Sequence, residues 1–191
     1  MKKIASLAFV AAIAVFSSFK PAATTWKLDK AHSKLGFTIT HLAVSEVEGF
    51  FKSFDATITT NGADFTDATV DMTGQVESIN TDNEKRDEHL KSAEFFDASK
   101  FATITFKSTS FKKSGKNYKV KGNLTLHGVT KPVELEAVVR TGTNPMSGKE
   151  VAGFKITGKI KRADFDLGSK YGAPMLSDEV QITANAEFGK E

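Results

Sequence analysis

Several stretches of this chain alternate apolar and polar side chains with a period of two. The clearest alternating runs are Leu35–His41, Phe54–Ile58, Ala102–Phe106 and Phe154–Ile160. A period of two places each apolar set on one face of a β-strand. The chain has 16 phenylalanines but only two tyrosines and one tryptophan, and Phe carries no hydrogen-bonding group. The pattern therefore favours an apolar interior that binds an apolar ligand, and it argues against a catalytic site there.

The alternation predicts an all-β domain of eight strands. They are expected at 33–42, 48–60, 67–79, 101–110, 117–126, 132–141, 151–162 and 179–188, with a short lead-in strand at Trp26–Asp29. Turn-forming pairs such as Asn61-Gly62 and Ser114-Gly115 punctuate them, which is typical of an antiparallel barrel or sandwich. Gly74, Gly122 and Gly158 fall at inward positions, where they predict a bend or room for a group to approach the backbone, either of which would leave space in the lumen. The alternative is that they only let the strands coil.

One helix is expected to interrupt the strands. Thr81 to Glu84 reads as a capping box with Thr81 as the N-cap, and the helical spacing continues to Phe95-Phe96. Arg86 and His89 are three residues apart and share a helix face, so both are candidates to meet a ligand headgroup. The alternative is that Arg86 pairs with Asp87 or Asp164 and fixes the helix to the barrel.

The first 23 residues resemble a secretory leader. Lys2 and Lys3 precede a short apolar stretch, and small residues end it near Ala23. Residues 24–191 then form one domain. Loss of the leader removes three lysines and no acid, which leaves basic and acidic side chains in equal number. This balance argues against a nucleic-acid partner. The absence of cysteine with such a leader predicts a bacterial periplasmic protein.

Four histidines invite a metal or catalytic interpretation. His32 and His41 are nine residues apart, which puts them on opposite faces of an unbroken strand, while His89 and His127 stand alone. No established metal-ligand spacing and no nucleophile elbow is present in the sequence. We expect no metal, no other cofactor and no catalytic residue, and expect the histidines to hydrogen-bond locally.

Five segments resemble the YceI-like family. They are Asp29–Phe54, Arg86–Asp97, Gly122–Val133, Lys161–Phe165 and Asp178–Val180. The resemblance implies an eight-stranded lipocalin-like barrel covered by a helix, which binds polyisoprenoids or related amphiphiles in the periplasm. Two positions depart from the family: Ala102 stands where Pro is frequent, and Asp166 where Gly is frequent. Asp tolerates a left-handed backbone, so the turn at Asp166 is expected to survive.

These observations lead to one hypothesis and two alternatives. The chain is expected to bind, and to transport or store, a polyisoprenoid or similar amphiphile, with no catalysis and with transient membrane contact. The expected ligand-binding residues are Phe37, Ile39, His41, Phe54, Phe106, Leu124, Phe154, Ile156, Arg86 and His89. The alternatives are a metal-assisted or hydrolytic enzyme that uses the histidines, and a ligand-free stress or interaction protein with a filled barrel. The oligomeric state, headgroup and tail length are left open.

Overall fold

The computed structural model describes residues 23–62 and 64–191. Its elements are β1 (Thr24–His41), β2 (Ser45–Phe51), β3 (Phe54–Thr60), β4 (Thr69–Gln75), η1 (Val76–Ser78), β5 (Ile79–Asn80), α1 (Glu84–Lys91), β6 (Thr103–Ser114), β7 (Asn117–Leu126), β8 (Val129–Thr143), β9 (Glu150–Lys161), η2 (Arg162–Phe165) and β10 (Leu176–Lys190). Residues 1–22 of the expected leader lie outside the described residues.

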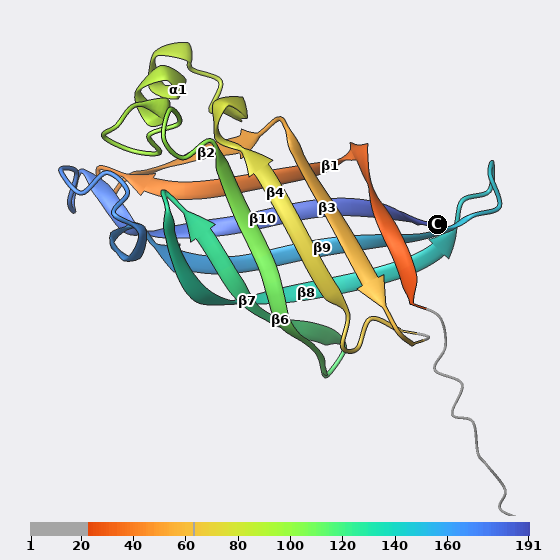
Figure 1. Ribbon diagram of the computed structural model, residues 1–191. Helices are drawn as coiled ribbons and strands as arrows, with labels where there is room; N and C mark the ends of the chain where they lie inside the picture. Colours follow the sequence, from red (N-terminus) through yellow and green to blue (C-terminus); the bar gives the residue numbers. More distant parts are fainter. Residues whose placement is uncertain (1–22, 63) are drawn as a thin grey trace, which may run out of the picture.

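The strands form one sheet that closes on itself. Its order is β10-β9-β8-β7-β6-β4-β3-β1-β2-β5, and β10 also pairs with β1. Because β2 leads directly into β3 and β4 leads through η1 into β5, the wall is a closed barrel of eight antiparallel strands, as predicted. Figure 1 shows α1 and the blue loop before β10 at one end, which we call the α1 end, and the β8–β9 hairpin at the other.

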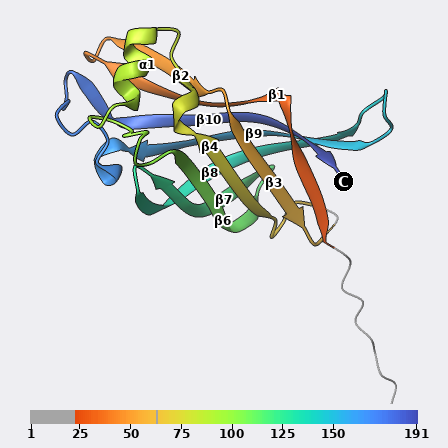
Figure 2. The same ribbon diagram turned by 45° about the horizontal axis from the view of Figure 1, so that its top comes forward.

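Four of the expected strands are connected differently in the structure. The lead-in strand and the strand at 33–42 are one bent strand, β1, whose register with β10 breaks between Asp29 and Lys34. Its first part pairs with β3 and its second part with β2, and Figures 1 and 2 show the bend. An irregular register of this kind bends a strand, so one long strand can serve two neighbours.

The strand predicted at 48–60 is instead broken into β2 and β3, and the one at 67–79 is interrupted by η1. Hydrogen bonds hold the β2–β3 break beside η1, where the second strand is interrupted. The backbone N–H of Lys52 donates to the carbonyl of Ser78 (3.0 Å), and that of Ser53 donates to the Ser78 hydroxyl (3.0 Å). The paired breaks therefore turn both strands together beside α1.

Inward glycines make room for neighbouring side chains instead of leaving open space. A Cβ atom on Gly122 would lie 2.4 Å from the ring of Phe106, and one on Gly158 would lie 2.2 Å from the Leu135 side chain. The space-in-the-lumen interpretation is therefore wrong at these two positions. Asp166 does adopt the predicted left-handed backbone, with φ 55° at the end of η2.

The end of the barrel opposite α1 is closed by a group of aromatic rings that we call the aromatic plug. Phe154 lies at its centre, with ring centroids 4.9 Å from Phe65, 5.3 Å from Phe188 and 6.4 Å from Phe111. Trp26 joins through Phe65 at 5.2 Å. Phe111 and Phe188 are almost fully buried, so protein closes this end of the lumen.

Candidate ligand cavity

The barrel encloses two cavities with mainly apolar walls. The outer cavity has a volume of about 370 Å³ and reaches α1 and the loop before β10. It meets the surface there, since Met175 lines it and is 50% exposed. The inner cavity has a volume of about 110 Å³, and every residue that lines it is apolar. The filled-barrel alternative predicted no continuous cavity.

All ten expected ligand-binding residues line these cavities. Phe37, Ile39, His41, Arg86 and His89 line the outer cavity, Phe54, Phe106, Phe154 and Ile156 line the inner one, and Leu124 lines both. Contact of any of them with a ligand remains a prediction. The sequence pattern predicts that they share one lumen, whereas the structure distributes them over two cavities.

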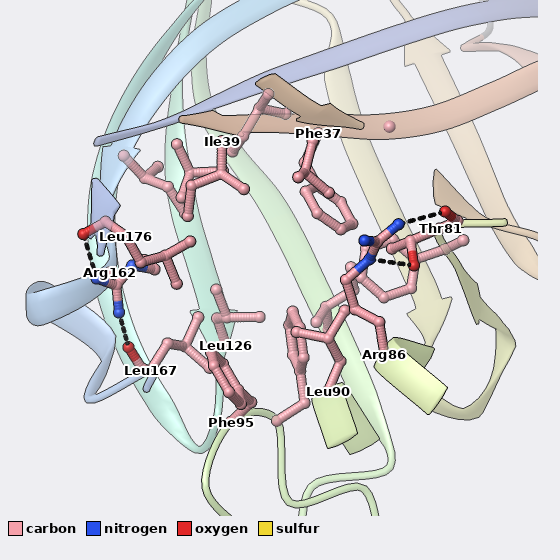
Figure 3. Close-up of a pocket in the computed structure, with 18 of the residues that line it drawn as sticks. Phe37, Ile39, Thr81, Arg86, Leu90, Phe95, Leu126, Arg162, Leu167 and Leu176 are labelled. Carbon is pink, nitrogen blue, oxygen red and sulfur yellow. Dashed lines mark hydrogen bonds between the residues drawn. The ribbon is translucent and has the colours of Figure 1, made fainter. Parts of the chain in front are cut away.

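Phe37 owes its position to a glycine on the neighbouring strand. Phe37 pairs with Gly49 in the β1–β2 register, and a Cβ atom on Gly49 would lie 2.3 Å from the Phe37 ring. The ring therefore lies across the β2 backbone and extends into the outer cavity, as Figure 3 shows. The sequence reasoning missed this role of Gly49, although a glycine inside an alternating strand is a recognisable sign of close approach.

Arg86 is oriented by neutral groups at the edge of the outer cavity. Its Nε donates to the Thr81 hydroxyl (2.8 Å), and its Nη2 donates to the Thr81 carbonyl (2.8 Å). Thr81 donates its backbone N–H and hydroxyl to Oδ1 of Asp87, at 2.8 and 2.6 Å. Among the described residues no carboxylate lies within 4.0 Å of the guanidinium, so the alternative that Arg86 pairs with Asp87 or Asp164 is wrong.

The same contacts correct the predicted helix. The N-cap of α1 is Asn83, whose side chain accepts from the Arg86 N–H, and not Thr81. Thr81 lies two residues before Asn83 and does not cap the helix, because its hydroxyl is already bonded to Asp87 and Arg86. The helix ends at Lys91 with Ser92 as its C-cap, short of the predicted Phe95-Phe96. Those two rings still line the outer cavity, from the turn that follows the helix.

Arg162 is a second arginine beside the outer cavity, and its role was not predicted. It donates to five backbone carbonyls: those of Ser177 (2.8 Å), Leu167 (2.6 Å), Gly168 (3.0 Å), Tyr171 (2.7 Å) and Leu176 (3.3 Å). Its residue surface is 6% exposed, and this burial lowers the pKa of its guanidinium, an effect opposed by nearby Asp178.

These bonds fix the loop before β10 on the side of the cavity opposite Arg86, as Figure 3 shows. The only sign in the sequence was the Lys161-Arg162 segment of the family resemblance.

A hydrogen-bonded cluster, which we call the rim latch, joins the α1 side of the opening to this loop. The Glu94 carboxylate accepts from Lys170 (2.7 Å), His89 Nε2 (2.8 Å) and the Tyr171 hydroxyl (2.8 Å). The bonds from Lys170, His89 and Tyr171, in that order of size, lower the pKa of Glu94 to about 2. Phe95 and Tyr171 stack beneath them with centroids 5.2 Å apart. His89 is thus already engaged by Glu94, a partner that the sequence did not suggest.

The other histidines lie apart from one another. The Nδ1 of His127 donates to the carbonyl of Phe165 (3.1 Å), which ties the β7–β8 turn to η2, a partner distant in sequence. His32 lies at the surface, where its ring is hydrogen-bonded to the Asp29 carboxylate. This bond lowers the pKa of Asp29 and raises the pKa of His32. Asp29, His32 and Glu187 each offer one atom that could bind a metal ion, and these three atoms lie within 4.8 Å of one another. None of the three residues lines either cavity.

No helix in residues 23–62 and 64–191 is long and apolar enough to cross a membrane.

The fold and its cavities define the class: a closed antiparallel barrel with an apolar lumen and a polar rim at one end. The YceI-like domain model matches residues 26–188, and protein YceI of Salmonella newport is 41% identical over 184 residues, 95% of each chain. The chain belongs to the YceI-like family.

Solved structures share the fold. The Campylobacter jejuni YCEI protein has a TM-score of 0.73 at 36% identity, over 86% of this chain and 96% of that one. Burkholderia cenocepacia BcnA has a TM-score of 0.74 at 25% identity, over 84% and 98%. A polyisoprenoid binding domain from Saccharophagus degradans has a TM-score of 0.62 at 16% identity, over 87% and 98%, which shows the fold alone.

Proposed function

We propose that this protein binds a long-tailed amphiphile, such as a polyisoprenoid, in the barrel lumen without altering it covalently. The observation that carries the proposal is the distribution of polarity along the lumen. The inner cavity is entirely apolar, whereas the polar side chains of the outer cavity stand at its α1 end. The tail would fill the apolar part, and the headgroup would remain near α1.

The energetics require only that the lumen resemble a membrane interior. Burial of one methylene group gains about 0.8 kcal/mol relative to water. A membrane offers the tail the same gain, so a carrier needs walls of similar polarity more than high affinity. Selectivity then rests on the few polar groups at the rim.

Arg86 is the side chain best placed to bind the headgroup. Its Nε and Nη2 are held by Thr81, while its Nη1 has no hydrogen-bond partner among the described residues. A guanidinium in this state can donate to a carbonyl, hydroxyl or phosphate oxygen. Arg162 has already filled its hydrogen-bonding capacity with backbone carbonyls, so its role is to shape the rim.

The comparisons support a binding role for the family, and the fold is also that of a domain named for polyisoprenoid binding. Transport or storage of the ligand, and a periplasmic location after removal of residues 1–23, are part of the proposal and rest on the leader-like sequence.

Transient membrane contact also belongs to the proposal. Leu42 and Val44 are 52% and 83% exposed in the β1–β2 turn, and the Leu42 N–H donates to the carbonyl of Met175 at the opening (3.0 Å). Apolar side chains exposed beside a lipid cavity are suited to touch the membrane from which the ligand would come.

Native mass spectrometry of the protein purified after export tests the proposal. We expect a bound lipid with a long apolar tail, identified after extraction by mass analysis, and uptake of added prenols by the emptied protein. Protein that is consistently free of lipid and rejects prenols would overturn it. Stoichiometric zinc or iron in elemental analysis would instead favour the enzyme alternative.

A substitution separates the headgroup from the tail. Arg86→Met keeps a long apolar stem and removes the donors, so affinity for the extracted lipid is expected to fall about tenfold, the equivalent of 1.4 kcal/mol. Arg140→Met is the matched control, because Arg140 is exposed and lines neither cavity. Equal affinities of the two variants would remove Arg86 from the site.

A further inference from the structure

Four apolar side chains stand where the outer and inner cavities meet, a set that we call the constriction. Leu35, Met72, Leu124 and Ile182 line both the outer and the inner cavity, so they stand at the boundary between them. They come from four different strands of the barrel: β1, β4, β7 and β10. A tail that enters from the α1 end must pass them to reach the inner cavity.

Met72 differs from the other three in its freedom to move. Its side chain is unbranched, with three rotatable bonds, whereas Leu and Ile are branched and stiffer. Its pairing partner on β3 is Ala56, which carries only a methyl group, while its partner on β6 is the larger Phe106. Met72 is also only half-buried, whereas Leu35 and Leu124 are buried. Rotation of Met72 toward Ala56 is therefore the change that meets least resistance at the constriction.

We propose that Met72 sets the length of tail that the barrel accepts, by separating an outer cavity that short tails fill from an inner cavity that only longer tails reach. This inference rests on the proposed function, because it assigns a length preference to the same lipid site. Short tails bind in the outer cavity with the constriction closed. Longer tails bind only when Met72 swings aside, and they then gain contact with the inner, wholly apolar wall.

A ladder of linear prenols that differ by single isoprene units tests the proposal on the emptied protein by native mass spectrometry. Met72→Ala should join the two cavities and raise the affinity for the longest prenols about tenfold relative to the shortest. Met72→Phe should obstruct the passage and lower that ratio by about the same factor. Met146→Ala is the matched control, because Met146 is 95% exposed in the β8–β9 turn and should leave the ratio unchanged.

A second variant guards against misfolding at position 72. Ala184 lines the inner cavity alone, so Ala184→Leu should fill that cavity and act as Met72→Phe does. Circular dichroism and thermal unfolding establish that each variant is folded. An unchanged length preference in Met72→Ala, Met72→Phe and Ala184→Leu, all of which still bind prenols, overturns the length gate and leaves the proposed function standing. Failure of the natural protein to bind any prenol overturns both.

Discussion

The two ends of the barrel are built from different interactions. At the closed end, rings pack around Phe154 at centroid distances between 4.9 and 6.4 Å. At the α1 end, Arg86, Arg162 and Glu94 hold their surroundings through hydrogen bonds, and a cavity of about 370 Å³ lies between them. One end is closed by packed rings, and the other is an opening held by hydrogen bonds.

The two ends of the barrel therefore serve different purposes: the aromatic plug stabilises the fold, and the rim leaves space for a ligand. Apolar packing is strongest where no space is left, since each void removes contacts from its lining. A rim that must stay open cannot be packed in this way, and hydrogen bonds between loops can hold its shape without filling it. The barrel therefore offers the ligand a hydrogen-bonded opening that leads to an apolar interior, and the packed rings at the far end stabilise the fold.

Removal of a ring from the aromatic plug should have the largest effect on stability. Phe154 is 4% exposed and touches three other rings, so Phe154→Ala is expected to lower the free energy of unfolding by about 4 kcal/mol. Chemical denaturation followed by the fluorescence of Trp26, the single tryptophan, measures this. Phe37 at the other end is only half-buried and contacts a single ring, that of Phe51 with centroids 6.0 Å apart, so Phe37→Ala should cost less, about 2 kcal/mol. Equal losses in the two variants would contradict the contrast between the ends.

Loss of the Arg162 guanidinium should have the next largest effect. Arg162→Leu leaves five carbonyls without their donor, and the expected cost is about 3 kcal/mol. Hydrogen exchange should show faster opening of residues 167–176 than of the plug. Arg140→Leu, at an exposed position, should stay within about 0.5 kcal/mol of the natural chain. A loss spread evenly over the barrel would show that Arg162 does not act on the rim in particular.

A smaller effect is expected from Thr81, which links Arg86 to Asp87. Thr81→Val keeps the shape but removes the hydroxyl, and should cost about 1.5 kcal/mol. Because Arg86 would lose one of its two bonds to Thr81, the lipid affinity should fall as well. Thr125→Val removes an exposed hydroxyl pair with Thr130 and serves as the control in denaturation and binding measurements. An unchanged lipid affinity in Thr81→Val would mean that Arg86 needs no such support.

The barrel could be predicted from the sequence because its physical basis is periodic. Alternation at Leu35–His41 or Phe154–Ile160 fixes which side chains face inward, whatever the neighbouring strand. Breaks in the pattern were less visible. The bend in β1 and the paired interruptions at Lys52 and η1 depend on which strands meet there, and that information lies in contacts between distant residues.

The rim was harder to predict for the same reason. Arg86 and His89 were found because they share a short helix, but Glu94, Lys170 and Tyr171 meet only after the barrel has closed. Arg162 bonds backbone carbonyls, and carbonyls carry no sequence signature. The division of the lumen at Met72 likewise depends on four strands at once.

The rim latch should give the smallest effect, recognisable by its pH dependence. The pKa of Glu94 is lowered to about 2 from 4.5, chiefly by its bond from Lys170, so the folded state favours the ionised carboxylate. Its contribution to stability is then complete above pH 4.5 and is lost as the pH falls toward 2. Glu94→Gln should be slightly less stable than the natural chain at neutral pH, and the two stabilities should converge through that acidic window. The effect is small because the cluster is solvent-exposed. A difference between the two proteins that persists unchanged at pH 2 would show that the carboxylate charge is not what holds the latch.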